Sequence, residues 1–360
     1  MKEEEPLAFF DEVVKKVFGS AAHVQGYKEL SKKNTALGRL TLRDAEIPTV
    51  IIKYNPHLGR MPAAAGMIDL LEEQLVFQHL ATLSIRKKLR PTVLGMEHGR
   101  FILIEDLGEK TIVQKSDDYD SLLAASFAHL HGSSMGRYSG YQALRNKMGL
   151  GHDFRRYGKP AMERLFARGR GFLANRFDIS YLRHHQPEVV TILDKIENAI
   201  KHPGRFHALI HDHLSNQRQF FVDDDDLLLL DFELARYSHS LLDFVKPVMG
   251  QFAINEQDSH YQWIGPYFSL QLLHTYRDTL ANEYGQHYED DEWREAIFYG
   301  LSYGAISFIG RLCYLEPDRK LVGSLSSNIK MILHRMQELC LELKVENSLT
   351  AFIGSFLKEG

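Results

Sequence analysis

The stretch HALIHDHLSNQRQFFVDDDDLLLLDFELARY, residues 207–237, interrupts a part of the chain whose pattern is otherwise mostly helical. Its apolar runs are short and rich in β-formers, and the acidic residues 223–226 lie between two of them. Short apolar runs bounded by turn residues are typical of buried strands. We therefore predict two short strands joined by an acidic turn, with Asp231 directly after the second strand.

The first 108 residues have a different pattern. Residues 6–18 and 62–82 carry apolar stripes at helical spacing, whereas the segments 24–54 and 91–108 are β-rich and interrupted by turn residues. Lys53 lies inside one of these β-branched runs. It is either a buried charge, which needs a partner, or an edge-strand lysine that opposes aggregation.

Beyond residue 108 the sequence is mostly helical in pattern. One helix is expected to begin near Ser116, which is a favourable N-cap. Further helical patterns occupy residues 160–175, 187–200, 240–253, 258–283, 290–314 and 319–343. We predict an α+β protein of two lobes: residues 1–108 with a leading helix, a small antiparallel sheet and one helix, and residues 109–360 as a helical lobe.

The composition excludes several classes of protein. Of 360 residues, 44% are hydrophobic and 25% are charged, which is typical of globular proteins rather than disordered chains. The net charge of −4 lacks the basic excess usual in nucleic-acid-binding proteins. No apolar run is long enough to predict a membrane span. The two cysteines, Cys313 and Cys340, form no CxxC motif and are typical of buried thiols in a reducing cytoplasm.

The order of these elements and several short motifs resemble the aminoglycoside phosphotransferase and choline kinase group of the protein-kinase-like fold. The resemblance runs from about residue 24 to residue 250, and more loosely to the end. Its motifs are VIIK (50–53), LLEEQLVFQHLATL (70–83), ILIEDLG (102–108), SFAHLHG (126–132), LIHDHLSNQRQFFV (209–222), LLLLDFELARY (227–237) and LLDFV (241–245). It implies a bilobal fold and ATP- and Mg²⁺-dependent phosphorylation of a small-molecule hydroxyl, with an aminoglycoside-, sugar- or choline-like acceptor.

The resemblance also implies roles for residues of the first lobe. Lys53 would hold the ATP phosphates as a point charge, and Glu73, rather than Glu72, would pair with it. The backbone around Glu105–Leu107 would meet the adenine edge. The turn at 31–35 departs from the family, because lysines such as Lys33 replace its usual glycines. These lysines either contact phosphate by charge or form an exposed basic turn.

The second half of the site depends on how the catalytic loop is aligned. Asp231 would bind Mg²⁺, because this hard cation prefers carboxylate oxygen. In one register Asp212 is the base and Gln217 stands at the position of a metal-binding asparagine. In the other register His213 replaces the base and Arg218 replaces the asparagine, which would disfavour metal binding because arginine has no acceptor. We prefer the first register, because it keeps a carboxylate at the base position.

Two other functions compete with the small-molecule kinase. A divergent loop could make the chain a catalytically impaired pseudokinase that serves as a nucleotide-binding or scaffold protein. Alternatively, the histidines near Asp212 could form a transition-metal site of a hydrolase. The basic segment 155–176 and the acidic segment 289–292 could contact charged partners or substrates, but solvated helix faces are the simpler interpretation.

Overall fold

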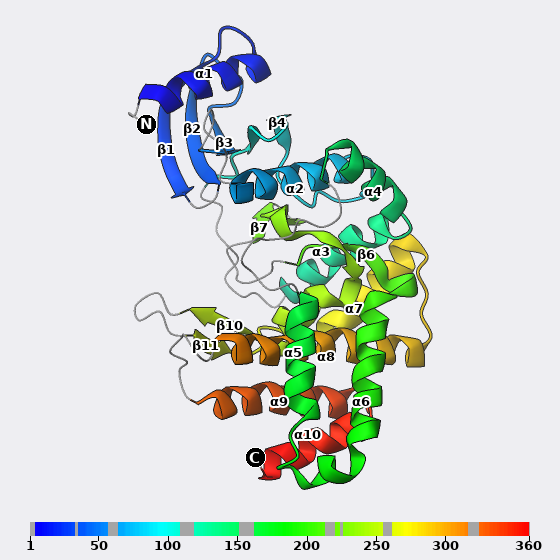
Figure 1. Ribbon diagram of the computed structural model, residues 1–360. Helices are drawn as coiled ribbons and strands as arrows, with labels where there is room; N and C mark the ends of the chain where they lie inside the picture. Colours follow the sequence, from blue (N-terminus) through cyan, green and yellow to red (C-terminus); the bar gives the residue numbers. More distant parts are fainter. Residues whose placement is uncertain are drawn as a thin grey trace. The chain divides into compact units, whose positions relative to one another are not determined.

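The computed structural model describes residues 4–32, 35–56, 64–108, 119–150, 162–212, 220–223, 226–254, 261–315 and 324–359. The chain divides into two compact units, and each unit is built from three separate segments (Figure 1). Unit 1 consists of Met1–Ser116, Ser139–Tyr157 and Gln217–Ala235. Unit 2 consists of Asp117–Tyr138, Gly158–Asn216 and Arg236–Gly360. This division differs from the single boundary predicted at residue 108, because two later segments belong to the same unit as the N-terminal sheet.

Unit 1 contains a five-stranded antiparallel sheet in the order β1-β2-β3-β5-β4. Its strands are β1 (His23–Lys32), β2 (Ala36–Arg43), β3 (Thr49–Tyr54), β4 (Val93–Glu97) and β5 (Phe101–Glu105). Side chains alternate between the two faces of a strand. In β3, Val50, Ile52 and Tyr54 join the core cluster that also contains the apolar residues of α1 (Glu4–Phe18). Lys53 therefore points to the opposite face.

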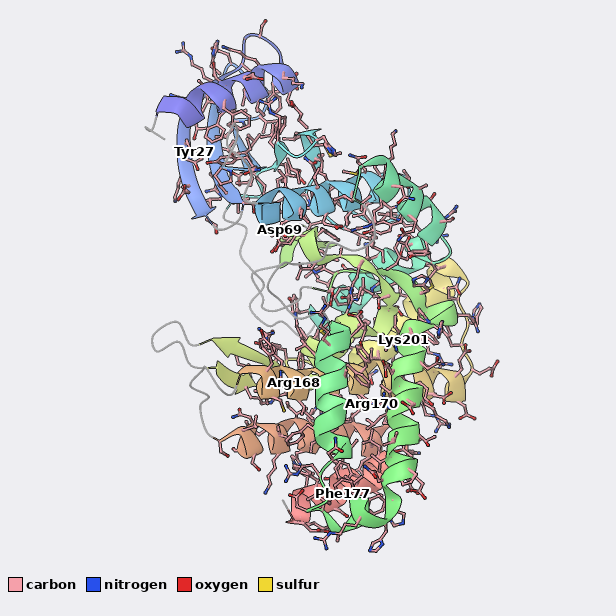
Figure 2. The ribbon with its side chains drawn as sticks, viewed as in Figure 1. Tyr27, Asp69, Arg168, Arg170, Phe177 and Lys201 are labelled. Carbon is pink, nitrogen blue, oxygen red and sulfur yellow. The ribbon has the colours of Figure 1, made fainter. Side chains whose placement is uncertain are left out.

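The sheet also depends on a close approach between β1 and β2. The ring of Tyr27, which is labelled in Figure 2, lies over Gly38, and a Cβ at this glycine would collide with it. The Tyr27 ring also packs 4.8 Å from that of Phe10 on α1, measured between centroids. Its hydroxyl lies 3.2 Å from the hydroxyl of Tyr54. A glycine is therefore needed at this position of β2 so that the aromatic cluster can form.

Helix α2 (Ala64–Leu80) is enclosed within unit 1. Every residue from Leu70 to Phe77 is buried, so this part of the helix does not have the solvated polar face expected of an amphipathic helix. Two later segments complete the unit: α4 (Tyr138–Lys147), which belongs to unit 1 from Ser139 onward, and the hairpin of β7 (Phe220–Asp223) and β8 (Asp226–Leu229). A short 3₁₀ helix, η3 (Phe232–Leu234), follows β8 and packs on α2.

Unit 2 is mainly helical. Its helices are α3 (Tyr119–Ser134), α5 (Met162–Ala174), α6 (Ser180–Lys201), α7 (Gln271–Tyr284), α8 (Asp290–Leu315), α9 (Leu325–Glu342) and α10 (Ser348–Glu359). Two small antiparallel pairs accompany them: β6 (His207–Ile210) with β9 (Arg236–His239), and β10 (Gln251–Ile254) with β11 (Tyr261–Ile264). Helix α8 is long and apolar enough to cross a membrane, but 83% of its most apolar window is buried. It is therefore the core helix of this unit.

Several predicted elements differ from those observed. Residues 207–237 contribute four strands, because β6 and β9 pair with each other outside the predicted β7–β8 hairpin. The predicted helix at 240–253 is a 3₁₀ turn, then a π-helical turn, then β10, and the segment predicted as helix at 258–283 begins with β11. Gly250 explains the break, since its φ is +97° and a Cβ there would collide with the Ile264 carbonyl oxygen. Helices α4 and α10 were not predicted.

Candidate active site

Lys53 lies among three carboxylates in unit 1. Its Nζ is 2.7 Å from Glu73 Oε2, 3.1 Å from Asp231 Oδ1 and 3.3 Å from Glu233 Oε2. The lysine side chain is only 13% exposed. Because β3 lies between β2 and β5, Lys53 is a partnered, buried charge and not an edge-strand lysine.

The electrostatics of this cluster favour a cation. Burial opposes the charge of Lys53, but the attraction of the three carboxylates outweighs it and holds the lysine pKa well above its ordinary value. Burial raises the pKa of Glu73, and the nearby carboxylate of Asp231 adds to that effect. One ammonium thus faces three acidic groups, and negative charge is in excess around it.

The backbone after β8 positions Asp231. The Leu229 N–H donates to the Leu89 carbonyl oxygen at 2.7 Å, which fixes the end of the strand. Asp231 then adopts a left-handed conformation with φ of 65°, a region that aspartate tolerates better than most residues. The next residue, Phe232, is fully buried, and its ring centroid lies 5.8 Å from that of Phe77 on α2. Together these contacts orient the Asp231 carboxylate towards Lys53.

The segment predicted to meet adenine is fixed by side chains on both sides. Glu105 accepts hydrogen bonds from the Thr92 N–H at 2.7 Å and from Lys88 at 2.8 Å. These interactions outweigh the effect of burial and lower the glutamate pKa. Asp106, whose side chain is only 3% exposed, binds Arg39 Nε at 2.7 Å. The chain around Leu107 is therefore attached to the sheet at the end of β5.

Apolar side chains, among them Leu37, Ile51 and Ile104, share the face of the sheet to which Lys53 points. Leu37 lies opposite Lys53 in the β2–β3 register, and Ile104 lies opposite Ile51 in the β3–β5 register. Residues two apart on a strand and residues directly opposite each other share a face. All three side chains are half-buried. They form an apolar surface next to the charged cluster and next to the end of β5.

A buried hydrogen-bond network in unit 2 holds the backbone at Asp212, the residue predicted to be the base. The carboxylate of Asp243 accepts hydrogen bonds from the backbone N–H groups of His211 at 2.7 Å and Asp212 at 2.8 Å. His131 Nε2 lies 3.0 Å from the same carboxylate, and its Nδ1 lies 2.9 Å from the Tyr276 hydroxyl. Asp212 has a φ of 58°, so the network holds a left-handed turn directly after β6.

The carboxylate of Asp212 has a partner that sequence reasoning missed. Arg236 Nε donates to Asp212 Oδ2 at 2.8 Å, and its Nη1 lies 3.5 Å from Glu163 Oε1 on α5. Arg236 stands opposite Ile210 in the β6–β9 pair, which brings it to the end of β6 where the turn begins. Burial opposes the guanidinium charge, but Asp212 outweighs it and raises the arginine pKa. The only sequence signal is the arginine at the end of LLLLDFELARY.

Three predicted site residues, Lys33, His213 and Gln217, lie outside the described residues. Within the described ranges, no group of three or more histidine, cysteine or acidic residues has the arrangement of a metal centre. His207 packs instead against the rings of Tyr138 and Tyr237, at centroid distances of 4.9 and 5.4 Å. The described residues therefore give the alternative of a metal-dependent hydrolase no support.

The basic segment is largely balanced where the structure describes it. Arg168 and Arg170 both lie on α5 and are labelled in Figure 2. Arg170 binds Asp194 at 2.5 Å and Glu197 at 3.0 Å, both on α6. Arg168 lies over the ring of Tyr314. These contacts favour a structural role for this part of α5.

Comparison with known proteins identifies the fold. Neither a protein-family model nor a curated protein sequence matches the chain. Among solved structures, it is similar to a protein assigned as an aminoglycoside phosphotransferase from Ralstonia eutropha JMP134, at 13% identity and a TM-score of 0.52 over 98% of each chain. It is also similar to choline kinase from Cryptosporidium parvum Iowa II, at 11% identity and a TM-score of 0.53 over 98% of this chain and 99% of the other. The chain has a protein-kinase-like fold, as its motifs predicted.

Proposed function

We propose that the protein is a phosphotransferase that moves the γ-phosphoryl group of ATP to a hydroxyl of a small molecule. The observation that carries the proposal is the cluster in which Lys53 binds Glu73 and Asp231. A protein-kinase-like fold with a lysine–glutamate pair and a strand-end aspartate has the parts that phosphoryl transfer requires. Fold alone would not support the activity, because one fold can host many functions.

The proposed nucleotide site uses two neighbouring features of unit 1. The ammonium of Lys53 would bind the phosphates, with Glu73 fixing its position. The half-buried side chains of Leu37, Ile51 and Ile104 would provide an apolar surface for adenine. The backbone at Glu105–Leu107 would recognise the adenine edge by hydrogen bonds. Flat apolar surfaces with a few polar groups are typical of such ligand sites.

The donor chemistry around Lys53 fits Mg²⁺. Asp231 and Glu233 supply carboxylate oxygens, which are the ligands this hard cation prefers, and negative charge is in excess there. We assign Asp231 as the main metal ligand, and Gln217 as a second ligand. When bound, Mg²⁺ would neutralise charge on the phosphates.

Asp212 would orient the acceptor hydroxyl and accept its proton. Its ion pair with Arg236 keeps it oriented, and a loose phosphoryl-transfer transition state needs positioning more than a strong base. The second register, with His213 in this role, remains the alternative. We further propose that the acceptor is an aminoglycoside-, sugar- or choline-like alcohol, and that the protein works in the cytoplasm, where the thiols of Cys313 and Cys340 would stay reduced.

The same ion pair favours a second candidate function. The candidate base, Asp212, already binds the guanidinium of Arg236 at 2.8 Å. For catalysis, the Asp212 carboxylate must still be able to bind the acceptor hydroxyl. If Arg236 holds Asp212 permanently, the protein would bind nucleotide without transferring phosphate. In that case it would be a pseudokinase with a binding or scaffold role.

A thermal-shift titration tests the proposal first. Mg²⁺, ATP and both together are added to the wild type, to Asp231→Asn and to Asp278→Asn, which changes an exposed aspartate on α7. We expect a shift only with Mg²⁺ and ATP together, in the wild type and in Asp278→Asn but not in Asp231→Asn. Ligand at 100 times its Kd should stabilise the fold by about 2.7 kcal/mol. No shift at millimolar ATP would contradict nucleotide binding.

Labelled ATP then separates the enzyme from the pseudokinase. A panel of aminosugars, sugars and amino alcohols is incubated with labelled ATP and the protein, with Asp212→Asn as the inactive variant. Transfer that depends on Asp212 supports the enzyme. Nucleotide binding without transfer to any member of the panel, and without ATP hydrolysis, supports the pseudokinase.

A further inference from the structure

Three consecutive residues in the middle of α2 send their side chains to three different parts of unit 1. All three, Glu72, Glu73 and Gln74, are buried. Glu72 binds Arg145 of α4, and Glu73 binds Lys53 of β3. Gln74 binds the β4–β5 turn region. It donates hydrogen bonds to the carbonyl oxygens of Glu97 and Phe101 and accepts one from the Gly99 N–H.

These three anchors fix the rotation of the helix. Successive residues of an α-helix point about 100° apart, so the anchors pull on α2 in different directions. A rotation that released one side chain would also move the next. The pairing of Glu73 with Lys53 therefore depends on what holds Glu72 and Gln74.

The contact between Glu72 and Arg145 is the charged anchor from outside the sheet. Both Nη atoms of Arg145 donate to the carboxylate, each at 2.6 Å, and the two side chains are 8% and 5% exposed. Such a two-pronged pair fixes direction as well as distance. One turn earlier on α4, the ring of Tyr141 packs edge-on against His79 of α2, with centroids 5.3 Å apart. Helix α4 thus contacts α2 at two points on one side.

Stability alone does not account for a buried ion pair of this kind. The cost of removing two charges from water often cancels the attraction between them, so well-packed apolar residues would serve stability equally well. A directional pair next to the glutamate that binds Lys53 does provide a defined helix orientation.

We propose that Arg145 is a positioning residue for the nucleotide site: by binding Glu72 it holds α2 in the rotation that keeps Glu73 on Lys53. The link to nucleotide rests on the proposed function, whereas the effect on Lys53 itself does not. Arg145 binds Glu72, the neighbour of Glu73 on α2, so it acts through the helix. Its segment of chain lies between α3 and α5 of unit 2, outside the N-terminal 116 residues.

The first test measures the accessibility of Lys53 and needs no ligand. The full chain is treated briefly with N-hydroxysuccinimidyl acetate, and acetylation of Lys53 is followed by mass spectrometry. The double variant Glu72→Met/Arg145→Met removes both charges, which avoids an unpaired buried charge. Arg294→Met/Asp291→Met removes an exposed pair on α8 and is the matched control. We expect acetylation about tenfold faster in the first variant, a typical size for coupling between linked groups, and no change in the control.

Arg145→Lys provides a milder variant in case the double variant fails to fold. Lysine keeps the charge but not the planar fork, so an intermediate rate of acetylation is expected. Lys53 protection equal to that of the wild type, in either folded variant, would overturn the proposal.

The second test asks whether Arg145 acts through Glu73. ATP affinity is measured for the wild type, Glu73→Gln, Glu72→Met/Arg145→Met and the combination of all three changes. We expect the Arg145 variant to raise the ATP Kd about tenfold, and to have little further effect once Glu73 is removed. Independent, additive effects would overturn the proposal. If the wild type binds no ATP, the proposed function fails, and the acetylation rates still decide the role of Arg145.

Discussion

Three largely buried cationic side chains of this protein have carboxylate partners that are distant in sequence. Lys53, Arg145 and Arg236 are each largely buried, and each lies within 3.1 Å of at least one carboxylate. Removing one member of a buried pair leaves the other uncompensated, which typically costs about 3–5 kcal/mol. Variants that remove both members are therefore the better tests of role, because they separate function from folding.

His79 makes stability depend on pH. It is only 2% exposed on α2, and burial lowers its pKa from 6.5 to about 4. The unfolded chain then binds a proton more readily than the folded chain does. The stabilising effect of a neutral His79 is therefore complete above pH 6.5 and is lost as the pH falls towards 4.

We expect the free energy of unfolding of the wild type to fall between pH 6.5 and pH 4. The contribution from His79 is at most about 1.4 kcal/mol for each pH unit. His79→Leu removes the titrating group and should flatten the slope in this range. Urea unfolding at a series of pH values measures it, with the exposed His334→Leu on α9 as the control. Equal slopes in the wild type and His79→Leu would contradict the prediction.

At the scale of elements, helices α5 and α8 approach each other through glycines. A Cβ at Gly169 of α5 would collide with the Ile306 carbonyl oxygen of α8. A Cβ at Gly310 of α8 would likewise collide with the Leu165 carbonyl oxygen of α5. The backbones of the two helices are thus in contact, which explains why glycines interrupt two otherwise good helical sequences.

Two alanine variants on α5 test this contact. Gly169→Ala should destabilise the protein by about 1–3 kcal/mol, because overpacking forces the backbones apart. Gly171→Ala, two residues further on, meets open space and should stabilise it by up to about 1 kcal/mol through helix propensity. Thermal unfolding of both variants measures the difference. A Gly169→Ala variant as stable as Gly171→Ala would show that the helices separate easily.

The predictability of the elements followed the range of the interactions that form them. Strands β3 to β5 and helices such as α8 were predicted from local pattern, because alternation and helical spacing are local signals. The segment 240–264 was not, since Pro247 and Gly250 redirect a run whose apolar spacing also suits a helix, whereas α7 lies in the second half of the helix predicted at 258–283. The pair of β6 with β9 was missed because its partners lie far apart in sequence.

The candidate site was predictable to a similar extent. The resemblance to a family singled out Lys53, Glu73 and Asp231, and the structure brings these three together. Nothing in the local sequence marked Arg145 or Arg236, because an arginine on a helix or strand is usually solvated. Their importance depends on partners 73 and 24 residues away.

At the scale of the whole molecule, neither unit is a continuous piece of chain. Unit 1 needs Arg145 from its second segment to bind Glu72 of α2, and Asp231 from its third segment to bind Lys53 of β3. The hairpin β7–β8 and helix α4 are therefore parts of the N-terminal unit, although each is flanked in sequence by segments of unit 2.

A fragment of residues 1–116 should not fold as an independent domain. It leaves Glu72 without Arg145 and Lys53 without Asp231, and it exposes the apolar sides of α2. We expect no cooperative thermal unfolding by circular dichroism and no ATP binding, with the full chain as the reference. A fragment that unfolds cooperatively and binds ATP would contradict this.

The three-segment composition of unit 1 also has a consequence for synthesis on the ribosome. The N-terminal sheet emerges early, but the unit is complete only when residue 235 of 360 has left the exit tunnel. Until then, the incomplete unit exposes apolar surface of α2 and leaves Lys53 without Asp231. Folding intermediates with such exposed surface aggregate readily. The pace at which the ribosome translates residues 117–235 therefore influences how much of the newborn protein reaches its folded form.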